Sequence, residues 1–93
     1  NGFGLTHGGI TYCLADSGLA FASNSHGVQA VSIETSISHV RPVNAGDVLM
    51  ATAVEMSRSE RIAVYHIGVT NGTGTTVALF KGMVFRTGKP WAV

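Results

Sequence analysis

The sequence predicts an α+β domain in which one long central helix is followed by a curved antiparallel β-sheet that wraps around it. Two patterns indicate this class. A glycine-flanked apolar segment near the start carries a single charged residue and has helical spacing. The rest of the chain alternates apolar and polar residues with a period of two, and short connections rich in Gly, Asn and Pro separate its segments.

The helix is predicted from Gly9 to about Ser25. Its apolar residues cover most of the helix circumference, and they are Ile10, Leu14, Ala15, Ala20, Phe21 and Ala22. A helix that is apolar nearly all round is surrounded by protein. Gly8 and Gly9 predict a tight entry and Gly27 a stop. Gly18 costs a helix about 1 kcal/mol relative to Ala, so we expect a close packing contact there.

Strands are predicted at residues 28–40, 48–56, 61–70 and 75–86, with a hairpin turn at 71–74. In the first strand, strict alternation puts Val31, Ile33 and Ile37 on one face. The opposite face then carries Ser32, Glu34, Ser36 and Ser38. A sheet of this kind covers the helix on one side only, so a second copy of the chain is expected to cover the rest.

Composition agrees with a single domain that has subunit interfaces. The chain has 93 residues, of which only 12% are charged, against about 25% in an average globular chain. A net charge of +1 gives no electrostatic reason to expect nucleic acid or membrane as a partner. One cysteine, Cys13, fits a reducing compartment, so we expect a cytoplasmic protein. Cys13 is expected in the core, and the four histidines have no metal-ligand spacing.

Asp16 is the only Asp, Glu, Lys or Arg among the first 33 residues. Burying a carboxylate without partners costs several kcal/mol, so its presence in an apolar helix needs a reason. One hypothesis is that Asp16 lines a cleft as a general base or a nucleophile. The other is that it points outward or caps a neighbouring element.

The predicted helix start supplies a possible counterpart to this acid. Backbone N–H groups at a helix N-terminus are unpaired and lie at the positive end of the dipole. Gly8 has no side chain, so a substrate oxygen could approach its amide and be stabilised as an oxyanion. The alternative is that Gly8 and Gly9 only permit a turn.

The spacing of Gly8 and Asp16 constrains any shared chemistry. Eight residues at 1.5 Å each separate them by about 12 Å along a helix, whereas both would have to lie within about 4 Å of one carbonyl. If both are catalytic, Gly8 of one subunit must face Asp16 of another. A two-fold homodimer with antiparallel helices satisfies this condition.

The segments NGFGLTHGGITYCLADSGLAFASNS, AVSIETSISHVRPVNAGDVLMATA and VALFKGMVFRTG resemble the hotdog-fold acyl-CoA thioesterases, in particular the PaaI group of phenylacetic acid degradation. The resemblance runs from Asn1 to Gly88. Its specific part is N-x-x-G-x-x-H-G-G together with L-A-D, whose Asp lies seven residues after the second Gly. It implies a hotdog fold, an active site at the dimer interface, a dimer of dimers (homotetramer), and a further helix and strand before Asn1.

The resemblance also implies roles for individual residues. Asp16 is similar to the acid that activates water or attacks the thioester carbonyl, and Gly8 to the oxyanion amide. Asn1 matches an asparagine that positions the carbonyl or the water. Ser32 matches a polar position that can hold the attacking water, and His7 shapes the loop without transferring a proton.

The function implied is hydrolysis of an acyl-CoA, with arylacetyl-CoA as the first candidate, to a free acid and CoA without metal or cofactor. Arg41, Arg86 and Lys89 could meet the CoA phosphates or simply be solvated. Two alternatives remain at this stage. A hotdog-fold dehydratase would need a His beside Asp16, and none lies near it on the predicted helix. A non-catalytic acyl-CoA-binding module would have no need of Asp16.

Overall fold

The computed structural model describes residues 2–44 and 46–90. Helix α1 (Gly2–Asn24) is followed by strands β1 (Val28–His39), β2 (Met50–Arg58), β3 (Ile62–Thr70) and β4 (Thr76–Pro90). The strands form one antiparallel sheet in the order β1-β4-β3-β2. The predicted α+β class and the four predicted strands are therefore confirmed.

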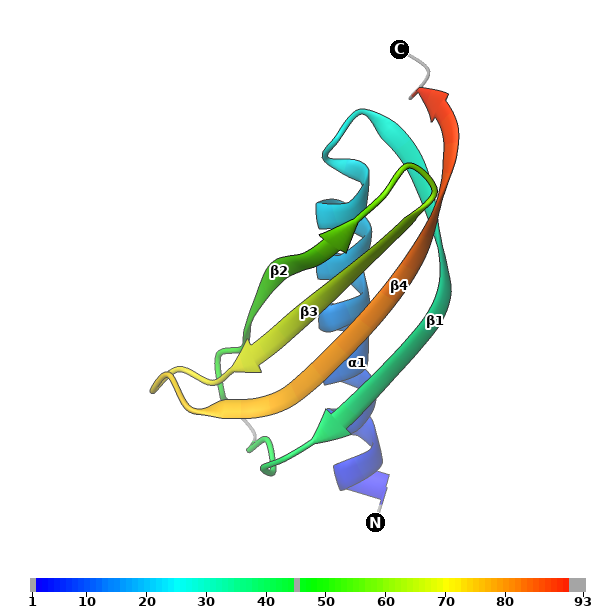
Figure 1. Cartoon of the computed structure of the whole chain (residues 1–93). Coiled ribbons are helices and arrows are strands. Elements are labelled where there is room, and N and C mark those ends of the chain that lie inside the picture. Colours follow the sequence, from blue (N-terminus) through cyan, green and yellow to red (C-terminus); the bar gives the residue numbers. More distant parts are fainter. Residues whose placement is uncertain (1, 45, 91–93) are drawn as a thin grey trace.

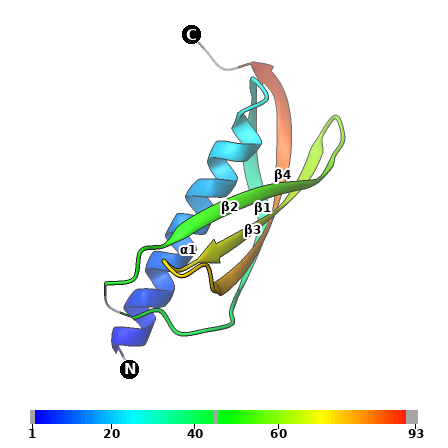
Figure 2. The same ribbon diagram turned by 90° about the vertical axis from the view of Figure 1, so that its left-hand side faces the viewer.

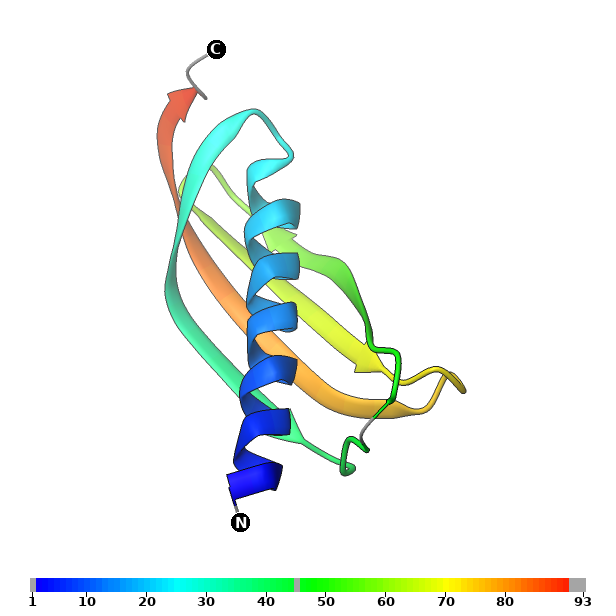
Figure 3. The same cartoon turned by 180° about the vertical axis from the view of Figure 1, so that it is seen from behind.

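The helix lies against one face of the sheet, and the curved strands cross it diagonally (Figures 1 and 2). The view from behind shows α1 in front of the sheet, with β1 running back along it (Figure 3). Within the described residues, β1 and β2 each pair on one side only. They are therefore the two edges of the sheet. No helix in this part of the chain has the length and hydropathy needed to span a bilayer.

The core fills the space between α1 and the inner face of the sheet. Its buried residues are Ala15, Leu19, Ala63, Tyr65, Ile67, Val69, Val77, Ala78, Phe80 and Val84. Gly82 of β4 makes room for the helix, because a Cβ there would come within 2.7 Å of Leu19 Cδ1. A Cβ on Gly18 would lie 3.7 Å from both Ala51 and Ile67. The packing contact predicted at Gly18 is therefore present.

The predicted start of the helix is wrong. The helix begins at Gly2 rather than Gly9 and ends at Asn24. Glycine weakens a helix by about 1 kcal/mol without forbidding the helical conformation, so Gly8 and Gly9 do not end it. Gly27 has a φ of 81° and lies just after the helix, which confirms the predicted stop.

The predicted faces of β1 are also partly wrong, because the strand contains a bulge. Ser32 pairs with Val84 and Glu34 with Met83, so Ile33 has no partner on β4. Val84 is buried against the helix, so Ser32 lies on the helix side of the sheet. Glu34 lies on the outer side, away from α1. A single unpaired residue thus separates Ser32 from the other polar positions of the strand.

One face of α1 is open in the single chain. Ile10 is 53% exposed and Phe21 is 83% exposed, and Cys13 is exposed as well. The expectation that Cys13 belongs to the core is therefore wrong for the protomer. These residues follow each other at helical spacing on the side opposite Ala15 and Leu19, so the apolar circumference predicted from the sequence is only half covered by the sheet.

Candidate active site

Asp16 lies on the flank of α1 that faces the edge strand β1. One turn earlier, the Tyr12 hydroxyl is hydrogen-bonded to Thr35 Oγ1 of β1 over 2.8 Å. The Tyr12 ring also meets Phe80 edge-on, with centroids 5.5 Å apart. Gly18, by contrast, contacts β2 and β3. Because successive helical residues are about 100° apart, Asp16 lies about 40° beyond Tyr12, on the β1 side.

The hydrogen bond between Tyr12 and Thr35 also indicates where Asp16 lies along the length of β1. From Tyr12 to Asp16 the helix rises about 6 Å. Because β1 runs back along the helix (Figure 3), about two strand residues from Thr35 cover the same distance. That step ends at the bulge beside Ser32. We infer that Asp16 and Ser32 lie at a similar level, both on the helix side of the sheet.

The Asp16 carboxylate is half-buried and makes no hydrogen bond or ion pair within residues 2–44 and 46–90. Two other acids in this part of the chain do have partners. Asp47 accepts from the Asn44 backbone N–H at 2.8 Å, and Glu55 contacts His26 at 3.0 Å. Asp16 therefore caps no neighbouring element among the described residues, and its oxygens are available to another molecule.

The structure places Gly8 differently from the prediction. Gly8 and His7 lie in the body of α1, where the amide of Gly8 faces the carbonyl of Gly4. It is not one of the unpaired amides at the helix start. Since Gly8 and Asp16 share one helix, they are about 12 Å apart along its axis, as the spacing predicts. They do not come together within one chain, and Asn1 lies outside the described residues.

The basic residues considered for CoA phosphates have other contacts. Arg41 Nη1 donates to the Thr76 carbonyl at 2.8 Å, and Arg86 Nη1 donates to the Ser59 carbonyl at 3.0 Å. Both guanidinium groups therefore hold strands and turns together. Lys89 is exposed near the end of β4.

A second polar cluster lies at the other edge of the sheet and was not predicted. Glu55 of β2 accepts a hydrogen bond from the Tyr65 hydroxyl at 2.9 Å, with His26 3.0 Å and Arg58 3.6 Å from the same oxygen. The Tyr65 hydrogen bond holds the pKa of Glu55 below its usual value, with further contributions from Arg58 and His26. Burial, and then the Glu55 carboxylate, raises the pKa of Tyr65 to about 12. No regular spacing in the sequence indicates this cluster.

The model of the thioesterase superfamily matches residues 3–78. The chain belongs to the thioesterase superfamily. The match contains the whole helix except its first residue, and also β1, β2 and β3, so it covers Asp16, Ser32 and Gly8 together.

Relatives with defined names agree with this assignment. The chain is 42% identical to the acyl-coenzyme A thioesterase PaaI of Escherichia coli over 88 residues. This alignment covers 95% of the chain and 63% of that protein. It is 41% identical to a putative esterase of Archaeoglobus fulgidus over 86 residues, and this alignment covers 92% of the chain and 56% of the relative. The chain thus spans less than two thirds of the length of either relative.

Solved structures share the fold. The structure of Escherichia coli PaaI, from the phenylacetic acid degradation operon, superposes with a TM-score of 0.86 at 42% identity, over 90% of this chain and 61% of that one. A Streptococcus mutans protein bound to acetyl CoA superposes with a TM-score of 0.88 at 30% identity, over 98% of this chain and 73% of that one. The hotdog fold expected from the sequence is therefore confirmed, and the domain is of the PaaI type.

Proposed function

We propose that this thioesterase-superfamily domain hydrolyses acyl-CoA thioesters to a free acid and CoA, with the carboxylate of Asp16 as its general base or nucleophile. The observation that carries the proposal is the Asp16 carboxylate, which is half-buried, has no partner among the described residues and faces an open sheet edge. The relative that is an acyl-coenzyme A thioesterase and the structural neighbour that binds acetyl CoA support the substrate class.

The proposed site is shared between two copies of the chain. Strand β1 is twelve residues long and pairs only with β4 among the described residues, so its free edge can pair with the same strand of a second copy. Val31 and Ile33 of this strand are 51% and 54% exposed. Pairing there would cover them and bring a second helix beside Asp16. We propose that such dimers pair in turn into a dimer of dimers.

In this arrangement, the Gly8 amide of the facing subunit stabilises the oxyanion. That role requires an N–H free of its intrahelical bond, so the helix would have to begin at Gly8 or later in the active assembly. The His7-Gly8-Gly9 sequence suits such an opening, since each glycine lowers helix stability by about 1 kcal/mol. Asn1 would then help to position the carbonyl or the water, and His7 would shape the loop.

The chemical step needs one base and one oxyanion donor. Asp16 takes a proton from a water molecule, which Ser32 helps to hold, as the water oxygen attacks the thioester carbonyl. The C–S bond then breaks, the thiolate of CoA takes up a proton, and the acid leaves. Direct attack by Asp16 is the second route, in which an anhydride forms and water hydrolyses it. Incorporation of ¹⁸O from labelled water into Asp16 in a single turnover identifies the anhydride route, provided that water attacks the Asp16 carbonyl of the anhydride.

A panel of acyl-CoA substrates tests the function. We expect release of free CoA thiol, detected with a thiol reagent, to be fastest with arylacetyl-CoA and slower with straight-chain acyl-CoA. If no substrate released CoA thiol but acyl-CoA bound saturably, the domain would be a non-catalytic binding module instead. A cytoplasmic setting, where CoA thioesters are made, fits the single cysteine of the sequence.

A further inference from the structure

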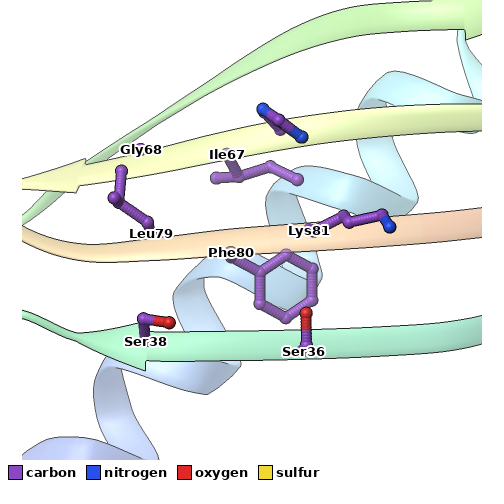
Figure 4. A pocket seen from close by; sticks show the side chains of 8 residues that line it. Ser36, Ser38, Ile67, Gly68, Leu79, Phe80 and Lys81 are labelled. Atoms are coloured by element: carbon purple, nitrogen blue, oxygen red, sulfur yellow. The ribbon is translucent and has the colours of Figure 1, made fainter.

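The outer face of the sheet, on the side away from α1, contains a hollow of about 240 Å³ that no step of the proposed hydrolysis uses. Six of the residues that line it are Ser36, Ser38, His66, Gly68, Leu79 and Lys81. Figure 4 labels all of these except His66 and shows them over β1, β4 and β3, with the helix behind the sheet. The hollow is therefore on the opposite side of the sheet from Asp16.

Two rows of paired residues build the hollow. Ser36 pairs with Lys81 and Lys81 with His66, which forms one row across three strands. In the next row Ser38 pairs with Leu79 and Leu79 with Gly68. These two rows lie side by side on the same face because strand residues two positions apart share a face.

Gly68 is the residue that leaves the space empty. A Cβ built on Gly68 would meet no atom within 4 Å, so the gap is open and is not filled by a neighbouring side chain. Below it, Ile67 and Phe80 are 1% and 2% exposed and form an apolar floor that belongs to the core. The hollow thus has an apolar floor, and its rim carries the exposed apolar side chain of Leu79 together with polar groups.

The polar groups around this space are all potential donors. Lys81 carries an ammonium, His66 an imidazole, and Ser36 and Ser38 each a hydroxyl. Within residues 2–44 and 46–90, none of these four side chains makes a hydrogen bond or an ion pair. Among the residues that the structure describes, no carboxylate lines the hollow, and Glu34 on the same face pairs further along the sheet with Met83.

We propose that this hollow binds the phosphate group of a small anion. A tetrahedral phosphate can accept hydrogen bonds from several donors at once, and lysine ammonium groups commonly bind it as point charges. The hollow has room for one phosphate and a few attached atoms beside Leu79. Free inorganic phosphate and a phosphorylated organic molecule share this chemistry. The site is independent of thioester hydrolysis, because it uses none of the residues proposed for that reaction.

Inorganic phosphate is the first probe. Adding it to ¹⁵N-labelled protein at constant ionic strength, with chloride as the replaced anion, should shift the backbone amides of Ser36, Gly68 and Lys81 in a saturable way. Lys81→Gln should weaken binding at least tenfold by removing the ammonium. Lys89→Gln removes the same charge elsewhere on β4 and should leave the affinity within twofold.

A second variant tests the space rather than the charge. Gly68→Leu places a side chain in the gap without changing charge, and it should abolish the saturable shifts while the other amide signals of the folded protein remain. Absence of saturable shifts in the unmodified protein, or equal phosphate affinity in Lys81→Gln, Gly68→Leu and Lys89→Gln, would overturn the proposal. This result is separate from the thiol-release assay, so either proposal can fail alone.

Adenosine 3′,5′-bisphosphate is the second probe and identifies the source of the phosphate. Binding at least tenfold tighter than that of inorganic phosphate, with the same loss in Lys81→Gln, supports a phosphorylated organic ligand. Equal affinities for the two probes support a site for free phosphate. Shifts by the nucleotide that do not include Ser36, Gly68 and Lys81 contradict a site in the hollow.

Discussion

The Tyr65 hydroxyl donates a hydrogen bond to Glu55 Oε1 over 2.9 Å, which joins strand β3 to the edge strand β2. The same oxygen lies 3.0 Å from His26 Nε2. Because His26 is in the turn that follows α1, one carboxylate oxygen connects the end of the helix to two strands. The edge strand opposite the proposed dimer contact is therefore held by polar contacts as well as by the sheet.

The first prediction concerns alkaline pH. The pKa of Tyr65 is raised to about 12, above the usual value of about 10. The neutral form is thus favoured by folding, and the stability it contributes is complete below about pH 10 and is lost as the pH rises through about 12. Tyr65→Phe should lower Tm at pH 7 by on the order of 5 °C and should flatten the pH dependence of Tm in this window.

Tyr12→Phe is the matched control for this experiment, because it removes the only other tyrosine hydroxyl of the chain. Tyr65 remains in that variant, so the alkaline loss of Tm should persist. Equal alkaline profiles in Tyr65→Phe and the unmodified protein would show that Tyr65 does not cause the loss.

The second prediction concerns acidic pH. The pKa of Glu55 is lowered, chiefly by the hydrogen bond from Tyr65. The charged carboxylate is thus favoured by folding, so its contribution is complete above the unfolded value of about 4.5 and is lost as the pH falls through the lower folded value. Glu55→Gln should reduce this acid dependence in thermal unfolding, whereas Glu60→Gln, at an exposed position, should not. An unchanged acid profile in Glu55→Gln would contradict the prediction.

The third prediction concerns the contact between α1 and β4. A Cβ at Gly82 would lie 2.7 Å from Leu19 Cδ1, and Leu19 is 1% exposed. Gly82→Ala should therefore destabilise the domain by about 1–3 kcal/mol through overpacking. Gly68→Ala is the control on the neighbouring strand, since nothing lies within 4 Å of its added Cβ. Similar unfolding free energies for the two variants in urea would contradict this packing.

The fourth prediction concerns the proposed catalytic carboxylate, Asp16. Asp16→Asn should lower kcat for acyl-CoA hydrolysis at least a hundredfold, because the amide cannot accept the proton. The fold should persist, since Asp16 makes no hydrogen bond or ion pair among the described residues. Glu60→Gln is the charge-matched control. A kcat within threefold of that of the unmodified protein would remove Asp16 from the mechanism.

The fifth prediction tests whether the site is shared. Gly8→Val and Asp16→Asn should each be inactive alone. A hybrid dimer of the two variants has one site with both substitutions and one site with neither. Because random mixing makes about half of the dimers hybrid, and each hybrid has one intact site of two, about a quarter of the unmodified rate should return. No recovery after exchange of subunits, shown by a tag on one variant, would mean that both residues serve the same chain.

The sequence alone predicted the helix and the strands of this fold, because the spacing of apolar residues indicates which face of each element is buried. The four strands and the stop at Gly27 follow from it. The start of the helix does not, because a glycine pair lowers helix stability by only about 2 kcal/mol and neighbouring residues decide the outcome. The exposure of Cys13 was missed for a related reason: an apolar circumference does not show which part is covered within one chain.

The site was predictable only where it is local. Asp16 stood out from the sequence as a lone charge, and its flank of the helix follows from the position of Tyr12. The inner position of Ser32 could not be predicted, because it depends on a pairing with Val84 that is far away in the chain. The contact between His26 and Glu55 spans 29 residues and likewise depends on the tertiary fold alone.

The unpaired Ile33 also affects how β1 can change in length. Ser32 and Glu34 already face neighbouring residues of β4, so a chain lacking Ile33 would form an uninterrupted ladder with every remaining side chain on its present face. If one residue were lost between Glu34 and His39 instead, the side chains on one side of the deletion would switch to the opposite face of the sheet. This switch would be avoided only if Ile33 entered the ladder and the bulge disappeared. Relatives that differ by one residue in this strand can therefore retain the same inward-facing serine, provided that the difference falls at this position.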